Sequence, residues 1–268
     1  MFSKSFLSRA HKVLGSKITD ILIEHNNFRG VYNLQLGLHL YDSSLVVDGR
    51  AGIKTLRCMV KYKDEPNFIY NITRPKNLNM KNYIMAYLAI EEGTVLHYNP
   101  TEKSFTTPYG IYAYWHPHTT IVKYIIRIAE NHGYHKITKD NVKRVNLIFT
   151  KTQRNAMRNM AYEFYMEEYL DMKLYNKLKY TNKINTLLSV LSLSVNAHPR
   201  TGHILLQRAL GVNPDGVIGN VTLSKLNDYS DDELNTKFLR YAKSFYLSIT
   251  ERDRRYRKGY LNRIKNLS

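Results

Sequence analysis

One nine-residue pattern occurs twice in this chain of 268 residues, as Asp48-Gly49-Arg50-Ala51-Gly52-Ile53-Lys54-Thr55-Leu56 and as Asp215-Gly216-Val217-Ile218-Gly219-Asn220-Val221-Thr222-Leu223. The copies agree at Asp, both Gly, Thr and Leu, and each follows a Leu-Gln pair, Leu34-Gln35 and Leu206-Gln207. Asp-Gly combines a side chain that hydrogen-bonds nearby amides with a residue free to adopt positive φ. The pattern therefore predicts the same turn between two helices at two places in the chain.

The composition favours packed helices. Hydrophobic residues make up 43% of the chain and aromatic residues 12%, which is enough for one large core or two unequal ones. Leu, Ile and Tyr cluster at helical spacing, and there are only seven prolines. The single cysteine, Cys58, cannot form an intramolecular disulfide, so we expect it to be a buried small hydrophobe.

The net charge of +18 indicates an anionic partner, either nucleic acid or the bacterial envelope. The sequence has no zinc-finger spacing, no aromatic RNA-binding motif and no basic helix with heptads. Nucleic-acid binding therefore rests on charge alone, and we predict no nucleic-acid partner. The N-terminus does not resemble a signal peptide, and the longest apolar run, 187–195, is too short to span a bilayer. We expect a soluble protein made in the cytoplasm.

The first copy of the pattern resembles a known module. The stretch from Val31 to Gln35, followed by the residues from Val47 to Leu56, is similar to the small three-helix peptidoglycan-binding domain at the ends of many wall hydrolases. The resemblance covers about residues 15 to 65. It implies a module that holds an enzyme on its insoluble substrate.

A polar stretch from Thr73 to Asn79 with one proline is typical of a linker. We place the domain boundary there, with a wall-binding module at 1–76 and a catalytic domain at 77–268. Beyond the boundary the sequence predicts an irregular segment at 92–118. We expect helices at 80–91, 119–132, 138–172, 182–196, 200–210, 219–227, 231–249 and 254–266.

The irregular segment contains the candidate catalytic residue. Glu92 ends an apolar helix directly before Gly93 and a long polar loop, a position that favours facing a cleft. Hydrolysis of a glycosidic bond requires a protonated carboxyl that donates to the leaving oxygen, and partial burial favours that form. On these residues alone, Glu91 and Glu92 are equally compatible with a solvated helix end.

The same segment resembles the catalytic signature of the glycoside hydrolase family 108 muramidases. Glu92-Gly93 matches the opening of the signature and Tyr109-Gly110-Ile111 its aromatic-Gly-Ile turn, with Glu102 and Thr107 at its acidic and threonine positions. The similarity continues to about residue 266. It runs through Ala161, Tyr165, Tyr169, Asn196 and the stretch from Lys258 to Arg263. Thr94, Ser192 and Tyr260 depart from the usual glycine, aspartate and tryptophan.

The resemblance implies roles for particular residues. Glu92 is the expected general acid. Glu102 is either a catalytic or water-positioning carboxylate or a charge on a surface loop, and Thr107 is either a third catalytic residue or a residue that shapes the turn. Tyr109 is a candidate for stacking on a sugar. Asn196 follows an apolar helix, so it can either cap that helix or hydrogen-bond a sugar amide or the catalytic water, and we place it among the substrate-binding candidates. Asp48 and Asp215, in the two repeated turns, complete the substrate-binding candidates.

The sequence thus predicts an all-α protein, with a small three-helix wall-binding module and a lysozyme-like helical catalytic domain. Its expected function is that of a phage-type N-acetylmuramidase that degrades the wall for host lysis. The alternatives are a virion-associated enzyme, an inactive wall-binding protein or a lytic transglycosylase. The expected partner is peptidoglycan, and the basic run from Arg252 to Lys258 points also to anionic envelope lipids. We expect a monomer without metal or cofactor, released from the host cytoplasm to the wall.

Overall fold

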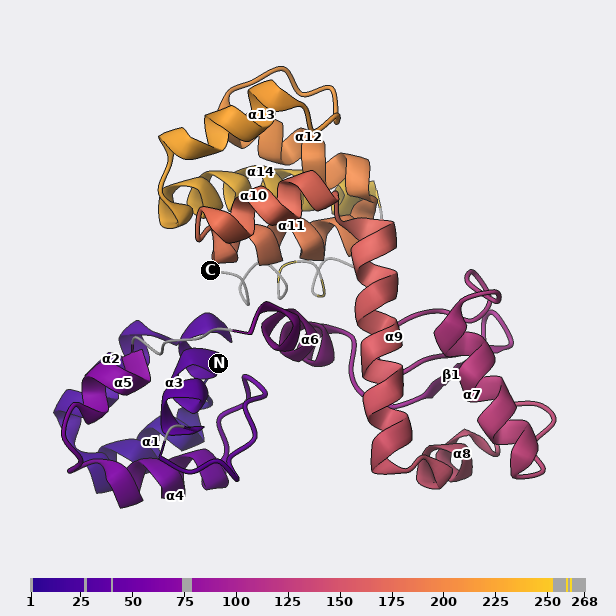
Figure 1. Cartoon of the computed structure of the whole chain (residues 1–268), viewed down its shortest axis with the longest axis horizontal. Coiled ribbons are helices and arrows are strands. Elements are labelled where there is room, and N and C mark those ends of the chain that lie inside the picture. Colours follow the sequence, from indigo (N-terminus) through magenta and orange to yellow (C-terminus); the bar gives the residue numbers. More distant parts are fainter. Residues whose placement is uncertain are drawn as a thin grey trace. The chain divides into compact units, whose positions relative to one another are not determined.

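A computed structural model describes residues 2–26, 28–39, 41–73 and 79–252, together with 259 and 261. This part of the chain contains fourteen α-helices and one two-stranded sheet (Figure 1), which confirms the predicted all-α class. None of its helices has the length and hydropathy needed to cross a membrane. Residues 74–78 of the predicted linker, most of the basic run after Arg252 and most of the predicted helix at 254–266 lie outside the described residues.

Contacts between Cα atoms divide the chain into two compact units. One unit comprises Met1–Tyr87 together with Leu170–Ser268, and the other is Leu88–Tyr169. This division differs from the boundary between residues 76 and 77 that the sequence suggested. It groups the N-terminal helices with the C-terminal ones and separates residues 88–169 from both. That boundary stays a prediction about where the chain can be cut.

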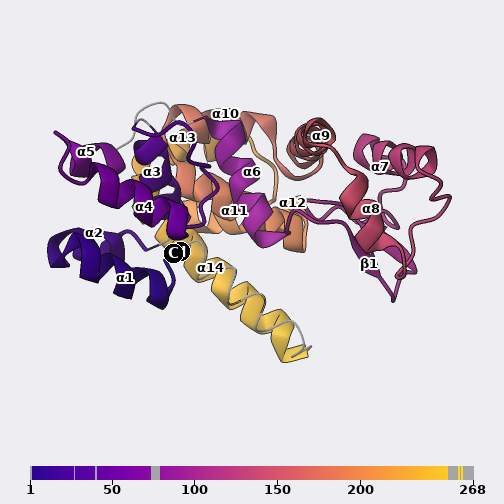
Figure 2. The ribbon, with the colours of Figure 1, turned by 90° about the horizontal axis from the view of Figure 1, so that it is seen from below.

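The N-terminal part of the first unit consists of five helices: α1 (Lys4–Leu14), α2 (Ser16–Glu24), α3 (Phe28–His39), α4 (Ile53–Tyr62) and α5 (Phe68–Thr73). Three of them, α2 to α4, lie in the stretch that resembles the three-helix module. Ser3 caps α1 by accepting a hydrogen bond from the amide of Phe6 at 3.0 Å. Figure 2 shows α1 and α2 side by side, next to a layer formed by α3, α4 and α5.

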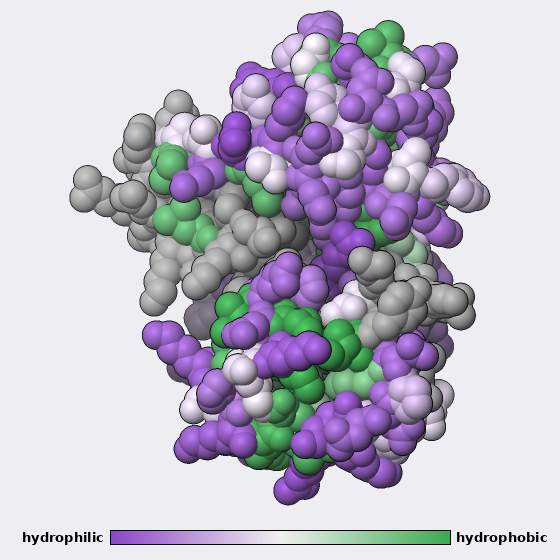
Figure 3. All heavy atoms as spheres, turned by 90° about the vertical axis from the view of Figure 1, so that its left-hand side faces the viewer, coloured by the Kyte–Doolittle hydropathy of each residue, from purple (hydrophilic) through white to green (hydrophobic). Residues whose placement is uncertain are grey.

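These five helices enclose one hydrophobic cluster whose members come only from residues 2–72. Cys58 belongs to it and is buried, as expected. Several large apolar side chains of these helices nevertheless remain exposed, among them Ile23 at 55% and Ile53 at 50%. Figure 3 shows hydrophobic residues gathered on the lower part of one face, below a mostly hydrophilic upper part.

Aromatic rings join α3 to α6 (Met80–Glu91), whose bounds confirm the predicted helix at 80–91. Tyr83 lies 5.2 Å from Phe28 and 4.8 Å from Tyr32, measured between ring centroids, and Tyr87 lies 5.4 Å from Phe28. All four side chains are buried. The N-terminal helices therefore pack on the start of the predicted catalytic domain through about 150–250 Å² of buried surface per ring.

The C-terminal part of the first unit surrounds α11 (Ile184–Ala197). Ten of its residues are buried, so the helix is covered on all sides. Its neighbours are α10 (Met172–Tyr180), α12 (Pro199–Leu210) and α14 (Asp231–Arg252), while α13 (Asn220–Lys225) and the 3-10 turn η1 (Leu226–Asp228) follow α12. The helices predicted at 182–196 and 200–210 agree with α11 and α12 within two residues, and the one at 219–227 corresponds to α13 and η1.

The second unit contains a small hairpin and three helices. Strands β1 (His97–Asn99) and β2 (Ser104–Thr106) pair antiparallel, with Tyr98 opposite Phe105. They are followed by α7 (Thr120–Asn131), α8 (Val142–Ile148) and α9 (Lys151–Tyr169). The hairpin lies where the sequence predicted an irregular segment.

The prediction of a single helix at 138–172 is wrong, because the chain breaks between α8 and α9. Thr150 and Gln153 form a reciprocal cap at the break: the amide of Gln153 donates to the Thr150 hydroxyl at 3.2 Å, and the amide of Thr150 donates to Gln153 Oε1 at 2.8 Å. Thr-x-x-Gln is a sequence signal for a helix start, and here it begins α9.

Candidate functional site

Glu92 lies at the junction of α6 and the loop that follows. Its amide makes the last hydrogen bond of the helix, to the carbonyl of Leu88 at 2.8 Å. Gly93 then takes φ +81°, which ends the helix and turns the chain toward the hairpin. The Glu92 side chain is half-buried. The helix end is thus where the sequence placed it, with the carboxyl neither in the core nor fully in solvent.

A tight turn at residues 107–111 packs against this helix end. The amide of Tyr109 donates to the carbonyl of Gly93 at 2.9 Å, and the amide of Gly110 donates to the carbonyl of Thr107 at 3.1 Å. Tyr109 and Gly110 both have positive φ, of 71° and 82°. The Tyr-Gly-Ile motif therefore forms a two-residue left-handed turn, a conformation that favours glycine.

The Glu92 side chain lies directly against Gly110. A Cβ atom added at Gly110 would come within 2.6 Å of Glu92 Cβ and 2.7 Å of Glu92 Oε2. Only a residue without a side chain leaves room there for the carboxyl. The structure therefore brings together Glu92 and Gly110, which are eighteen positions apart, and gives the glycine of the motif a steric reason to be present.

Thr107 is fully buried beneath the turn. Its hydroxyl donates to the carbonyl of Pro108 at 3.0 Å and accepts from the amide of Ile111 at 3.2 Å, and its amide donates to the carbonyl of Ile111 at 2.9 Å. Both hydrogen-bonding functions of the hydroxyl serve the turn. This placement suits the turn-shaping alternative, in which Thr107 is a positioning residue.

Two tyrosines of α9 approach the turn and Glu92. The hydroxyl of Tyr165 donates to the carbonyl of Tyr109 at 2.5 Å, which holds the turn against the helix. Burial, followed by the negative charges of Glu168 and Glu92, raises the pKa of Tyr169. Its hydroxyl therefore stays protonated at neutral pH, as a donor within electrostatic reach of Glu92.

Tyr109 itself is half-buried, with its hydroxyl close to two cations of α9. Burial raises the pKa of Tyr109, while the positive charges of Arg158 and Arg154 act in the opposite direction. The guanidinium of Arg154 also donates to the carbonyl of Asn146. The ring thus lies beside basic groups, and its predicted stacking on a sugar stays a prediction.

Glu102 belongs to a different set of contacts, in the loop between β1 and β2. Its Oε2 accepts from Asn99 Nδ2 at 2.6 Å, and its Oε1 accepts from Trp115 Nε1 at 3.3 Å. Glu102 is half-buried, whereas Trp115 is 66% exposed. The two hydrogen bonds fix the carboxylate at the hairpin and leave its catalytic role a prediction.

The remaining candidates, Asn196, Asp48 and Asp215, belong to the first unit. Asn196 Nδ2 donates to the carbonyl of Ser192, one helical turn earlier, at 2.7 Å. This bond secures the end of α11. Sugar binding by Asn196 stays a prediction.

The two repeated turns have the same internal structure, centred on a buried glutamine. In the first turn Gln35 Nε2 donates to Asp48 Oδ1 at 2.9 Å and to the carbonyl of Arg50 at 3.0 Å, while Gln35 Oε1 accepts from the amide of Gly49 at 2.7 Å. Asp48 Oδ1 also accepts from the amide of Arg50 at 2.9 Å. The carboxylate therefore helps to close its own turn.

The second turn repeats these bonds. Gln207 Nε2 donates to Asp215 Oδ1 at 2.8 Å and to the carbonyl of Val217 at 3.0 Å, and its Oε1 accepts from the amide of Gly216 at 2.7 Å. The bond from the amide of Val217, followed by that from Gln207, lowers the pKa of Asp215. The sequence repeat is therefore a structural repeat, and the aspartates that we predicted to bind substrate have a folding role in both copies.

Among the described residues, no group of three or more His, Cys, Asp or Glu side chains is arranged to hold a metal ion. The residues whose positions sequence reasoning did not foresee are those of α9. Tyr165 and Tyr169 were noted only as part of a family pattern, and their four-residue spacing puts both on one helical face. Arg154 and Arg158 are also four residues apart, but they belong to no motif that would have drawn attention to them in the sequence.

Comparison with known proteins identifies one region. Residues 201–265 match the family described as "Predicted Peptidoglycan domain", a match that includes the second repeated turn and supports peptidoglycan as the partner. No curated protein matches the chain in sequence. Among solved structures, that of Brucella abortus SagA aligns with a TM-score of 0.43 and 20% identity, over 70% of this chain and 90% of that one. At this level of similarity no function is transferred from SagA.

Proposed function

We propose that this protein is a peptidoglycan hydrolase, an N-acetylmuramidase that cleaves the β-1,4 bond between N-acetylmuramic acid and N-acetylglucosamine. The observation that carries the proposal is the position of Glu92, half-buried at a helix end and packed against Gly110. The peptidoglycan-domain match at 201–265 supports the substrate. The proposal includes the role predicted from the sequence, lysis of a host cell by a phage-type enzyme released from the host cytoplasm.

In this proposal Glu92 acts as the general acid. Its carboxyl donates a proton to the glycosidic oxygen as the bond from that oxygen to the anomeric carbon breaks. A water molecule supplies the hydroxyl that the anomeric carbon gains, and its remaining proton passes to a base. Glu102 is our candidate for orienting that water, and the protonated hydroxyl of Tyr169 can donate a hydrogen bond near Glu92.

The test is the variant Glu92→Gln, which preserves the shape of the side chain and removes its acidic proton. We expect the rate of release of reducing ends from purified sacculi to fall by about 100-fold or more, with sacculus binding unchanged. Glu91→Gln is the matched control, since it makes the same substitution at the adjacent glutamate and should have only a mild effect. Near-wild-type release by Glu92→Gln would refute the catalytic assignment.

The products also decide the reaction class. A hydrolase leaves reducing muramic acid ends, whereas a lytic transglycosylase leaves anhydro ends that are lighter by one water, and mass spectrometry of the digest separates the two. Anhydro ends would be compatible with Glu92 as the catalytic acid but would show that the reaction is not a hydrolysis. If wild-type protein binds sacculi and releases neither product, the chain is a wall-binding protein. The repeated turn favours this second candidate, because its second copy lies within the peptidoglycan-domain match and its first copy has the same bonds.

A further inference from the structure

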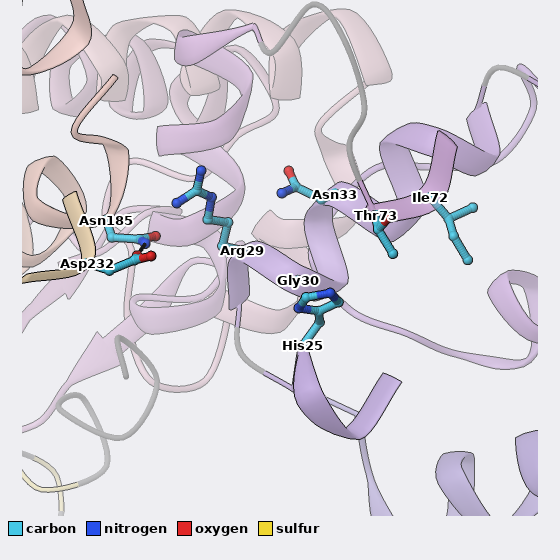
Figure 4. Close-up of a pocket in the computed structure, with 8 residues that line it drawn as sticks. All are labelled: His25, Arg29, Gly30, Asn33, Ile72, Thr73, Asn185 and Asp232. Atoms are coloured by element: carbon cyan, nitrogen blue, oxygen red, sulfur yellow. Dashed lines mark hydrogen bonds between the residues drawn. The ribbon is translucent and has the colours of Figure 1, made fainter. Parts of the chain in front are cut away.

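A polar pocket of about 490 Å³ lies in the first unit, remote in sequence from Glu92. His25, Arg29 and Asn33 line it from the N-terminal helices, and Asn185 and Asp232 from the starts of α11 and α14 (Figure 4). Its volume is within the usual range for small-molecule sites, about 300–1,000 Å³, but such sites are mostly apolar. A lining of charges and amides instead suits a polar, charged ligand.

Arg29 supplies the positive charge of the pocket. Its Nη1 donates to Asp231 Oδ2 at 3.4 Å, a contact that uses one of the five N–H groups of the guanidinium. Asp231 is itself engaged elsewhere, because it accepts from the amides of Asn185 at 2.9 Å and Thr186 at 3.0 Å and from the Thr186 hydroxyl at 2.9 Å. The long contact to Arg29 thus leaves the guanidinium able to bind a carboxylate through its planar fork.

Asp232 supplies the negative charge. It is exposed, and its Oδ1 accepts from Asn185 Nδ2 at 3.2 Å. Figure 4 shows Asn185 and Asp232 together on one side, Asn33 and Thr73 on the other, and Arg29 between them. A carboxylate has about four acceptor positions, so this single amide contact leaves Asp232 able to take an ammonium group.

A ligand that fits this lining carries both a carboxylate and an ammonium group. Peptidoglycan has such a part in its short peptide stems, whereas the N-acetyl groups of its glycan strands are uncharged. We propose that the pocket binds the peptide stem of peptidoglycan, with Arg29 on a stem carboxylate and Asp232 on a stem ammonium group. This inference rests on the proposed function only in taking peptidoglycan as the partner.

The test measures binding of soluble muropeptides to the full chain by isothermal titration calorimetry. The ligand is the disaccharide of N-acetylglucosamine and N-acetylmuramic acid with a tetrapeptide that contains a free diaminopimelate amino group. We expect Arg29→Gln and Asp232→Asn each to weaken binding about tenfold or more, because each removes a charged hydrogen bond. Arg57→Gln and Asp64→Asn, at exposed positions outside the pocket lining, are the matched controls and should bind as the wild type does.

Chemical changes to the ligand sharpen the test. Acetylation of the free amino group should weaken binding to the wild type. It should have little effect on binding to Asp232→Asn, because that variant lacks the carboxylate with which the amino group would pair. Arg29→Lys keeps the charge opposite Asp231 and loses the fork, so it should fold normally and still bind weakly. Thermal unfolding of each variant verifies that it is folded.

Two results would overturn the proposal. One is that wild type, Arg29→Lys and Asp232→Asn bind the muropeptide with equal affinity. The other is that the wild type binds the disaccharide without its peptide as tightly as it binds the muropeptide. The ligand contains no bond between N-acetylmuramic acid and a following N-acetylglucosamine, so a muramidase cannot cleave it. Glu92→Gln should accordingly bind it as tightly as the wild type, and failure of the catalytic proposal would leave this result unchanged.

Discussion

Substitution of Gly110 by alanine tests whether the 107–111 turn positions the carboxyl of Glu92, our proposed general acid. The new Cβ would meet Glu92 Cβ at 2.6 Å and Oε2 at 2.7 Å, and the backbone φ there is +82°. Positive φ costs an alanine about 1–2 kcal/mol, and overpacking adds about 1–3 kcal/mol. We expect a loss of about 2–5 kcal/mol in the free energy of unfolding, and a fall of about 100-fold in turnover, since displacement by about 1 Å can cost that much.

Gly133→Ala is the matched control in the same unit. Gly133 has φ +80°, and an added Cβ would meet nothing within 4 Å. It should lose only the backbone part, about 1–2 kcal/mol, with turnover unchanged. Chemical denaturation gives the stabilities, and reducing-end release from sacculi gives the rates. If the two variants had the same turnover at temperatures where both are folded, the idea that Gly110 positions Glu92 would be refuted.

Two further predictions concern the repeats and the charge. Gln207→Leu should destabilise the protein by about 1–3 kcal/mol for each buried partner left unpaired, and Gln35→Leu should have a similar effect. Urea denaturation measures both losses, with Arg208→Gln as a nearly neutral surface control. A small loss for one glutamine and a large loss for the other would show that the turns are not equivalent. Binding to sacculi should weaken between about 0.1 M and 1 M salt, where the Debye length falls from about 10 Å to 3 Å and screens the net charge of +18; a flat response in a pelleting assay would contradict charge attraction.

Helices with a clear local signal could be predicted from the sequence. The helix at 80–91 combines an unbroken apolar run with a terminating Gly93, and its bounds agree with α6. The prediction of a single helix at 138–172 was wrong because it relied on apolar spacing, which continues across the break. Local hydrogen bonds, not apolar spacing, set the position of that break. The Thr150 and Gln153 cap marks that break in the sequence and could have been recognised.

The hairpin was not predicted because its strands have only three residues each. Alternation over three residues is too short to be distinguished from a loop. Its stability depends on partners far along the chain, such as Asn146, which accepts from the amide of Leu96 at 2.9 Å and donates to its carbonyl at 2.8 Å. Such contacts have no local signature.

The candidate site divides in the same way. The motif residues Glu92 and Gly110 could be selected from the sequence, but not the contact between them, which depends on how the turn folds back. The sequence also did not distinguish residues that face a site from residues that hold a turn, a difference that the hydrogen bonds reveal. Thr107 is buried and engaged within its turn, and Asp48 and Asp215 close theirs.

The two glutamine-centred turns hold their outward residues with the same set of hydrogen bonds. Gln35 and Gln207 bond the main-chain carbonyls of the outward residues, which are Arg50 in one copy and Val217, 67% exposed, in the other. These supporting bonds therefore do not depend on which side chain stands at that position. Evolution can therefore alter what each copy displays while the supporting bonds stay constant. A duplication of this kind lets one protein carry a charged and an apolar version of the same loop, and gives protein engineers two equivalent positions for grafting new recognition sequences.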